Sequence, residues 1–532
     1  MEAYFQYCRV QEAVRLHLSE LEQNCKCKDY TVGSPHRPNC PSICIDAQSD
    51  EKEFCNQPNG SNETILVHWD GQDDPLNPAN QTTQRKLILT FLVSLIALAV
   101  TAASAIDACG VKQYSEFFGI SEVAGSLATG LFLVGFACGS LFSGPMSEMF
   151  GRNVVYFATM ILFLIFIMAS ALAPNLQSHL IFRFLAGLFA STPLSCAGGT
   201  VADLWSPLQK TYAFPAYAIP AFVGPMVGQI IGSFIPTTPT LGWRWLEWIM
   251  LILGGAVLII VMLFQPETYG NLILSWKAKA LRQQTGNDRY RSPMEMNSQT
   301  FGQRLRISIY RPFAMFYSEL IIILLSLYLT IMYIVLFTFL EGYTYVFGEA
   351  YGISQGLTSV CWTGMLVGVL FVGALIPVVY SWTAKEYKKT SAIAPEMRLW
   401  YAMLGGAPSV PISLFWMGWT SNSSISIWSP LIASVVFGYG ITTIFIISYM
   451  YLIDSYDIYA ASALGFLVFT RYVVAGGITV AGGPIYRSIG VQYTLTILGA
   501  ISAAMTPVPY LLYKYGPRIR KHSRYAVNSS TD

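Results

Sequence analysis

The sequence predicts an all-α membrane protein with twelve transmembrane helices in two six-helix bundles and both chain ends in the cytoplasm. Three observations predict this fold. The 532-residue chain is 53% hydrophobic and only 12% charged, against about 25% charged residues in an average soluble domain. Twelve apolar runs are long enough to cross a bilayer, which takes about 20 residues. Matching spans in the two halves of the chain also share unusual glycine and proline patterns.

The predicted spans cover most of the chain after residue 86. They lie near 87–107, 123–143, 154–174, 180–202, 212–235, 244–265, 313–340, 356–378, 397–419, 428–452, 460–484 and 490–513. The predicted inner segments hold 21 Lys and Arg residues and the outer loops only three, so the positive-inside rule places both ends in the cytoplasm. The lipid bilayer is therefore the first expected partner.

The spans divide the chain into five predicted parts: a polar cytoplasmic tail (1–84), an N-terminal six-helix bundle (85–265), a central cytoplasmic loop with an amphipathic helix (266–312), a C-terminal six-helix bundle (313–514) and a basic tail (515–532). The net charge of +2 gives no support for a nucleic-acid partner. No apolar targeting segment precedes the first span.

The polar tail holds six of the ten cysteines, namely Cys8, Cys25, Cys27, Cys40, Cys44 and Cys55. In a reducing cytosol disulfides are disfavoured. The spacing of these cysteines around His36 could hold zinc. The alternative is a disordered tail with incidental thiols, and we expect this second reading, with no bound metal.

Span 5 carries helix-breaking residues within an apolar run, at Pro220, Gly224, Pro225, Gly228 and Gly232. Glycines four residues apart form a smooth stripe that lets a second helix approach closely, and proline bends a helix.

Span 11, six spans later, matches span 5 with "VVAGGITVAGGPIY", and spans 2 and 8 form a second glycine-rich pair. We expect these helices to form a moving boundary between the two bundles. The alternative is that the small residues serve static packing.

Several stretches resemble the major facilitator superfamily. "GPMSEMFGRN" (144–153) resembles its signature loop, "IFRFLAGLFAS" its span 4 motif, and "VGPMVGQIIG" the span 5 motif associated with antiporters. Further stretches, including "GGTVADLW" and "YLIDSYDIYAASALGF", resemble the fungal DHA1-type (drug:proton antiporter) branch. The resemblance implies two bundles around a cavity lined by spans 1, 4, 7 and 10, with spans 2, 5, 8 and 11 meeting between the bundles.

The resemblance also implies roles for three sets of residues. The antiporter motif, at Gly224, Pro225, Gly228 and Gly232, implies a hinge and efflux. The signature loop implies a charge latch to the other bundle at the inner face, formed by Gly144, Glu148, Gly151, Arg152 and Asp203. The alternative is an ordinary solvated ion pair. The cavity candidates on spans 7 and 10 are Tyr328, Tyr333, Phe337, Glu341, Tyr439 and Thr442, where aromatic walls with few polar groups suit amphipathic compounds. The alternative is that these aromatic residues serve plain packing.

Ionisable residues inside spans indicate function because they are costly there. Asp107 and Arg183 lie near the outer ends of spans 1 and 4, so we expect them to pair and Asp107 to bind the coupling proton; the alternative is that Asp107 caps its helix and Arg183 reaches the headgroups. Arg244 and Glu247, three residues apart on span 6, are expected to satisfy one another. For Arg471 the sequence offers Glu319 or Asp454 as partners.

These features predict a proton-coupled secondary transporter that exports amphipathic organic compounds (drugs, fungicides or secondary metabolites) across the plasma membrane as a monomer. The absence of a Walker lysine loop disfavours ATP as the energy source, so the proton gradient takes the place of a cofactor. No nucleophile, base and orienting group cluster, which disfavours an enzyme. The alternatives are a polyamine or nutrient carrier and a transporter-like sensor that signals through its tail.

Overall fold

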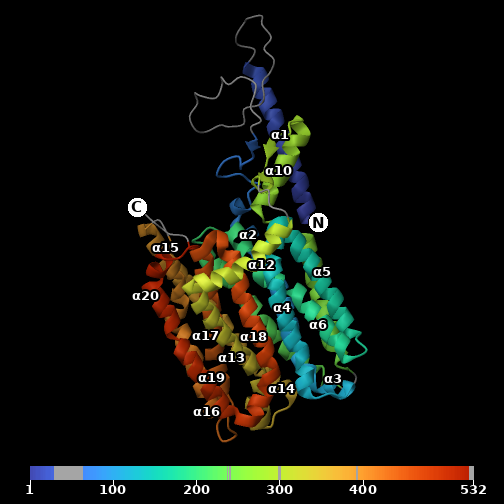
Figure 1. Ribbon diagram of the computed structural model, residues 1–532, viewed down its shortest axis with the longest axis vertical. Helices are drawn as coiled ribbons and strands as arrows, with labels where there is room; N and C mark the ends of the chain where they lie inside the picture. The colour runs from blue at the N-terminus through green and yellow to red at the C-terminus, as the bar shows by residue number, and fades with distance from the viewer. Residues whose placement is uncertain (29–63, 237, 239–240, 297–300, 391–392, 527–532) are drawn as a thin grey trace, which may run out of the picture. The chain divides into compact units, whose positions relative to one another are not determined.

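The computed structural model describes residues 1–28, 64–236, 238, 241–296, 301–390 and 393–526. The chain forms two compact units, a large helical body made of Met1–Glu2, Pro78–Tyr269 and Gln299–Asp532, and a smaller unit made of Ala3–Asn77 and Gly270–Ser298. The long helices of the body run side by side (Figure 1). We name helix ends by the predicted orientation, so that inner ends are those joined by the predicted cytoplasmic loops.

The first half of the body begins with a short 3₁₀ turn, η2 (Pro78–Asn80), followed by the elements of the N-terminal bundle. These are α2 (Thr83–Ile106), the 3₁₀ turn η3 (Asp107–Gly110), α3 (Val111–Phe118), α4 (Glu122–Phe150), α5 (Arg152–Ala171), α6 (Leu176–Ala190), α7 (Thr192–Leu204), α8 (Lys210–Phe234) and α9 (Arg244–Phe264).

The second half begins with α12 (Phe301–Ser318), which runs obliquely to its neighbours (Figure 1). The C-terminal bundle then consists of α13 (Leu320–Tyr343), the π-helical turn η4 (Thr344–Glu349), α14 (Gln355–Val360), α15 (Trp362–Thr390), η5 (Pro395–Leu399), η6 (Ala402–Gly406), α16 (Ala407–Thr420), α17 (Trp428–Tyr456), η7 (Asp457–Tyr459), α18 (Ala460–Ile489), α19 (Val491–Met505) and α20 (Pro507–Lys521).

Local sequence explains where several helices begin and end. The Ser121 and Asn175 side chains accept hydrogen bonds from the Ala124 and Ser178 backbone N–H groups, which caps the N-termini of α4 and α6. Gly119 ends α3 with φ of 67°, a conformation that glycine adopts without a Cβ penalty. These caps fix the outer turns that position the pocket described below.

Within the described part of the chain, eleven helices are long and apolar enough to span a membrane. The predicted ninth span is broken. A 3₁₀ turn (η5) and a π turn (η6) precede α16, and Gly405 inside η6 has φ of 94°. The eleven helices together with this interrupted segment are consistent with the predicted twelve-helix body.

Two helix pairs join the bundles. Spans 2 and 11 meet as α4 against α18, and spans 5 and 8 meet as α8 against α15. At the first seam Gly130 and Gly476 face one another, because a Cβ on either would lie 2.7–2.8 Å from the other's carbonyl oxygen. Close approach of these two backbones therefore requires glycine at both positions.

The span 5 glycines do not lie at a seam, contrary to our expectation of an inter-bundle hinge. A Cβ on Gly224 or Gly228 would meet α2 backbone at 2.7 Å (Leu98 oxygen) or 2.5 Å (Ala102 oxygen), and one on Gly232 would meet Ile106. The stripe thus packs α8 against α2 within one bundle. Glycines spaced by four residues face one neighbour, and the sequence alone does not say which neighbour that is.

The smaller unit combines α1 (Glu2–Lys28), β1 (Ile65–Leu66), α10 (Gly270–Thr285), β2 (Tyr290–Arg291) and α11 (Pro293–Met296). The two strands pair in parallel, and residues from the tail and the central loop share one apolar core.

The prediction of a disordered tail is therefore wrong for residues 2–28, because Val14 and Leu18 pack there against Leu281. His36, Cys40, Cys44 and Cys55 lie outside the described residues, so the zinc hypothesis keeps the status of a prediction.

Candidate functional site

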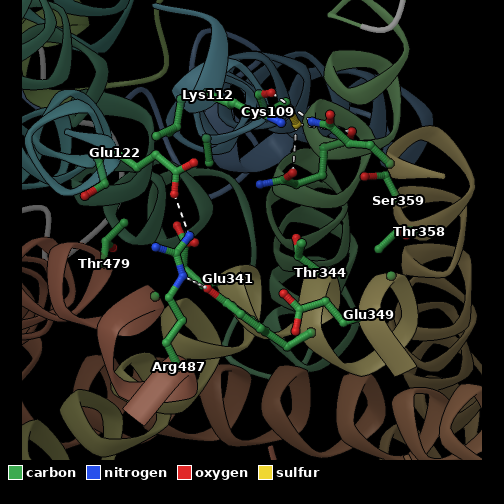
Figure 2. Close-up of a pocket in the computed structure, with 18 of the residues that line it drawn as sticks. Cys109, Lys112, Glu122, Glu341, Thr344, Glu349, Thr358, Ser359, Thr479 and Arg487 are labelled. Atoms are coloured by element: carbon green, nitrogen blue, oxygen red, sulfur yellow. Dashed lines mark hydrogen bonds and ion pairs between the residues drawn. The ribbon is translucent and has the colours of Figure 1, made fainter. Parts of the chain in front are cut away.

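A pocket of about 410 Å³ opens between the outer ends of the two bundles (Figure 2). Its wall is about half polar and half apolar. Glu122, Lys112 and Arg487 lie on one side, and Glu349 and Thr358 lie opposite. Its volume falls within the roughly 300–1,000 Å³ range of small-molecule sites.

An ion pair between Arg487 and Glu122 crosses the rim of this outer pocket, with 2.5 Å between the guanidinium nitrogen and the carboxylate oxygen. Both side chains are largely exposed, so the pair contributes under about 1 kcal/mol. Glu341, near the end of α13, also lines the pocket, three residues before Thr344 at the start of η4. The rim can therefore open without a large energetic cost.

A second, smaller pocket of about 30 Å³ lies deeper between the bundles and has aromatic walls. Its rings come from both halves of the chain: Phe222, Tyr333, Phe337, Trp362, Phe445 and Tyr472. Thr101 and Ser104 on α2 add hydroxyl groups, but both donate to carbonyls of their own helix. In this conformation the space is about that of one water molecule.

The two pockets follow one another along the same helices. On α13 Phe337 lines the inner pocket and Glu341 the outer one, four residues apart, which is about 6 Å along a helix. On α8 Met226 lines the inner pocket and Gln229, three residues later, lines the outer one. The geometry describes a path that is aromatic at its centre and polar at its outer end.

Arg471 lies behind the aromatic pocket and is fully buried. Its guanidinium carbon is 4.5 Å from the ring centre of Tyr333, 5.2 Å from that of Phe445 and 5.0 Å from that of Tyr472. It donates one hydrogen bond, to the Tyr449 hydroxyl at 2.8 Å. Neither partner expected from the sequence is present, because Asp454 pairs with Arg398 and Glu319 accepts from Tyr456 and the backbone of Arg524.

A cluster of fully buried charges lies within the N-terminal bundle, next to the outer pocket. The structure brings Asp107 and Arg183 together in a two-point contact, at 3.1 Å from Nε and 2.9 Å from Nη2. Glu247 of α9 contacts the Nε of the same arginine at 3.0 Å. Asp107 begins the turn whose next residues, Ala108 and Cys109, line the outer pocket.

The prediction that Glu247 pairs with Arg244 was wrong. Arg244 donates instead to the carbonyl oxygens of Ala171 and Ala173, while Glu247 accepts from Ser170 at 3.1 Å. Helix packing places α9 beside α5 and α2. The span 6 sequence contains no signal that identifies these neighbours.

Histidine and aromatic residues complete the cluster. His179 Nε2 lies 3.7 Å from Asp107, and its Nδ1 lies 3.0 Å from the Ser170 hydroxyl. The rings of Tyr114, Phe118 and Trp243 surround His179. These rings separate the charges from water on that side.

Asp107, His179 and Glu247 place ligand atoms within 4.8 Å of one another, as a metal site would. The guanidinium of Arg183 already contacts both carboxylates, so the protein itself supplies the positive charge. Two carboxylates face one guanidinium, so the cluster holds one more acid than its arginine balances. The arrangement suits the binding of one proton better than that of a divalent ion.

The inner side of the path is closed by hydrogen bonds between the bundles. Arg398, at the start of the broken ninth span, donates to Thr211 at 2.5 Å and to the Pro207 carbonyl at 2.7 Å, while pairing with Asp454. Tyr401 donates to the Thr211 carbonyl at 2.9 Å. The sequence analysis identified neither Arg398 nor Tyr401 as functional. The available signal was a basic residue, Arg398, at the start of a proline-containing span.

The signature loop forms a different set of contacts from the latch we expected. Arg152 pairs with Asp203 at 3.1 Å and bonds Ser147, all within the N-terminal bundle, and Gly151 precedes it with φ of 93°. Among the ion pairs of the described residues none includes Glu148, which is exposed.

Glu148 lines a small pocket facing the C-terminal bundle with Gly144 and Arg311. The backbone N–H of Arg152 also donates to Glu267, a residue outside the spans whose pKa is raised by burial. The loop is thus held from within its own bundle, and Glu148 alone of its charges faces the other one.

The remaining cavity candidates divide into two groups. Tyr333, Phe337 and Glu341 line the pockets described above. Tyr328, Tyr439 and Thr442 line neither the outer nor the inner pocket. Tyr328 and Thr442 are buried in the core, and the Tyr439 hydroxyl donates to the Leu404 carbonyl. Tyr328 and Tyr333 are five residues apart on α13, which is about 140° around the helix, so they do not share a face. The residue types alone did not resolve this.

Two helical bundles in a membrane, with successive pockets between them that are closed on one side and open on the other, define a transport protein. The comparisons with known proteins agree with this class. Residues 87–480 match the model of the Major Facilitator Superfamily. The chain is 46% identical over 477 residues to the MFS-type transporter kojT of Aspergillus oryzae, covering 89% of this chain and 84% of that protein.

A second relative, the ascochitine biosynthesis cluster MFS transporter of Didymella fabae, is 36% identical over 466 residues, covering 87% of this chain and 90% of the relative. The solved structure of the proton:xylose symporter XylE superposes with a TM-score of 0.58 at 14% identity, covering 82% of this chain and 96% of XylE, and shows the same fold. The chain belongs to the Major Facilitator Superfamily, and it is a secondary transporter and not an enzyme.

Proposed function

We propose that this protein is a proton-coupled exporter of small amphipathic organic compounds, in the DHA1-type (drug:proton antiporter) branch, and that it works by alternating access at the plasma membrane. The observation that carries the proposal is the buried cluster of Asp107, Glu247 and Arg183, which holds one more acid than its arginine balances. A buried excess charge is costly in a membrane, and one bound proton removes it.

Protonation gives the cluster two arrangements. With both acids ionised, Arg183 holds α2, α6 and α9 together. A proton on Asp107 weakens its contact with the guanidinium and leaves Glu247 as the remaining ionised partner. Because Asp107 begins the turn that continues into the outer pocket, such a change reaches the transport path directly.

The names of relatives support export of a cellular product. The transporters of Didymella fabae and Monascus ruber are named for the ascochitine and citrinin biosynthesis clusters. We infer that the compound transported here is a secondary metabolite or a similar toxic organic molecule. A polyamine or nutrient symporter differs in flux direction, since its proton and its solute would move the same way.

Proteoliposomes containing the full chain and a pH-sensitive dye test the proposal. Adding each of a panel of amphipathic compounds should drive proton movement opposite to compound movement for at least one of them. Asp107→Asn should reduce this coupled flux at least about tenfold, while Glu116→Gln, at an exposed acid on α3, should leave it unchanged. The proposal fails if transport ignores the pH gradient, or if Asp107→Asn retains full proton-driven flux at every pH.

A further inference from the structure

Five arginines are buried in the described part of the chain, and four of them contact a carboxylate. Arg152 pairs with Asp203, Arg183 with Asp107 and Glu247, Arg398 with Asp454, and Arg520 with Glu396. Arg471 is the exception: it is fully buried, yet among these ion pairs none includes it. A guanidinium is not deprotonated in proteins, so Arg471 keeps its positive charge.

The side chain of Arg471 also has free hydrogen-bonding capacity. Its Nη2 donates to Tyr449, while Nε and Nη1 have no partner among the described residues. Four aromatic rings lie 4.5–5.2 Å from the guanidinium carbon. Cation–π contacts offset part of the desolvation cost, but they do not satisfy N–H donors.

Three of these four rings, Tyr333, Phe445 and Tyr472, also form the wall of the inner aromatic pocket. The unbalanced charge therefore lies directly behind the surface that faces the transport path. An uncompensated buried charge costs several kcal/mol, and a structural role does not explain why this arginine alone lacks an acid. A negatively charged ligand that reaches past these rings would supply the missing partner.

We propose that Arg471 is the anion-binding group of the transport site and that the transported compounds are planar organic acids bound as anions. The proposal rests on the proposed function, in that the ligand is the transported compound. The flat rings stack on the ligand. Either free nitrogen, Nε or Nη1, can donate to one oxygen of its carboxylate or acidic enolate while the second hydrogen of Nη2 donates beside it, in the forked geometry that arginine prefers.

The outer pocket supports outward release of such an anion. Three acids line it, Glu122, Glu341 and Glu349, against the two bases Lys112 and Arg487. The inner pocket is too small for an organic acid in this conformation, at about 30 Å³. Loading therefore belongs to the alternative conformation, in which the bundles separate at their inner ends.

Matched pairs of small molecules test this assignment on the full chain in nanodiscs. We use benzoate against benzamide, and 2-naphthoate against 2-naphthamide, with 2-naphthylmethylammonium as the cation, and measure binding by titration calorimetry. At least one acid should bind about tenfold or more tightly than its amide, which corresponds to about 1.4 kcal/mol. In Arg471→Gln the affinities for the acid and its amide should differ by no more than about twofold, and Arg471→Lys should keep part of the preference for the acid. The control Lys514→Gln, at an exposed position on α20, should keep all of this preference.

Thermal unfolding of the same variants separates binding from folding. If Arg471 serves anion binding, Arg471→Gln removes an unbalanced charge and the unfolding temperature stays equal or rises, while the acid preference disappears. The assignment is overturned if no acid binds better than its amide, or if the preference survives in Arg471→Gln. Proton-coupled flux of neutral compounds without any preference for acids would contradict the anion site and leave the proposed function intact. Binding of acids without any transport would contradict the proposed function and leave the anion site intact.

Discussion

Arg183 shows how one residue sets the charge balance of the N-terminal bundle. Its guanidinium contacts two carboxylates and the Ala103 carbonyl. If it is removed, two fully buried acids face one another without a counter-charge. Breaking a buried ion pair by removing one partner typically costs about 3–5 kcal/mol.

We therefore expect Arg183→Met to lower the stability of the protein by about that amount, measured as a fall in the unfolding temperature in detergent. Adding Asp107→Asn removes one of the two stranded charges, so the double variant should recover part of the loss. Equal unfolding temperatures for the wild type and Arg183→Met would contradict the account of the cluster.

Only part of this cluster could be predicted from the sequence. Asp107 and Arg183 lie at the same depth on antiparallel neighbouring spans, so their pairing followed from position. Glu247 has Arg244 one helical turn away, which favoured the wrong partner. Its real partners, Arg183 on α6 and Ser170 on α5, come from tertiary packing of the N-terminal bundle. For Arg471 the available acids are engaged elsewhere, a fact that depends on the folded positions of Arg398 and Tyr456.

At the scale of elements, the seam between α4 and α18 depends on two glycines. A Cβ on Gly476 would lie 2.7 Å from the Gly130 carbonyl oxygen, whereas a Cβ on Gly477 meets nothing within 4 Å. We expect Gly476→Ala to force the helices apart and to cost about 1–3 kcal/mol, as overpacking does. Thermal unfolding should detect this loss, and the same substitution at Gly477 should cause none.

A second element, the short turn η5, connects the C-terminal segment to the inner closure. Glu396 on this turn accepts two contacts of 2.8 Å from Arg520, while Arg398, two residues later, reaches the other bundle. We expect Arg520→Met to strand the buried Glu396 and to loosen the turn. Limited proteolysis should then cut near residues 391–400 faster than in the wild type, and Lys521→Met, at the exposed next position, should leave the rate unchanged.

The elements themselves were largely predictable, because long apolar runs leave few alternatives in a membrane. The break in the ninth span was not, since it arises from the left-handed conformation of Gly405 within a run that reads as continuous. The sequence revealed the glycine stripe of α8 but not that it packs against α2. Periodicity identifies which residues share a helix face and does not identify the helix that this face contacts.

At the scale of the whole molecule, the structure is closed on the inner side and open on the outer side. The inner closure rests on Arg398 and Tyr401, which donate hydrogen bonds across the bundles to Thr211 and Pro207. The outer rim is joined by the exposed pair of Arg487 and Glu122. The stronger, buried contacts thus hold the inner end, and the balance between the two ends sets which side opens.

Weakening the inner contacts should shift this balance. Arg398→Gln loses two charge-assisted hydrogen bonds between the bundles, each of about 1.5–3 kcal/mol, so the population of the inward-open form should rise. Hydrogen exchange should then become about tenfold or more faster at residues 205–215 and 395–405, and slower at residues 341–349 as the outer pocket closes. Arg282→Gln, which breaks an ion pair with Glu295 inside the smaller unit, is the matched control and should leave both regions unchanged. Faster exchange at the inner ends with no change at the outer pocket would mean that the two ends open independently, and the account of alternating access would then fail.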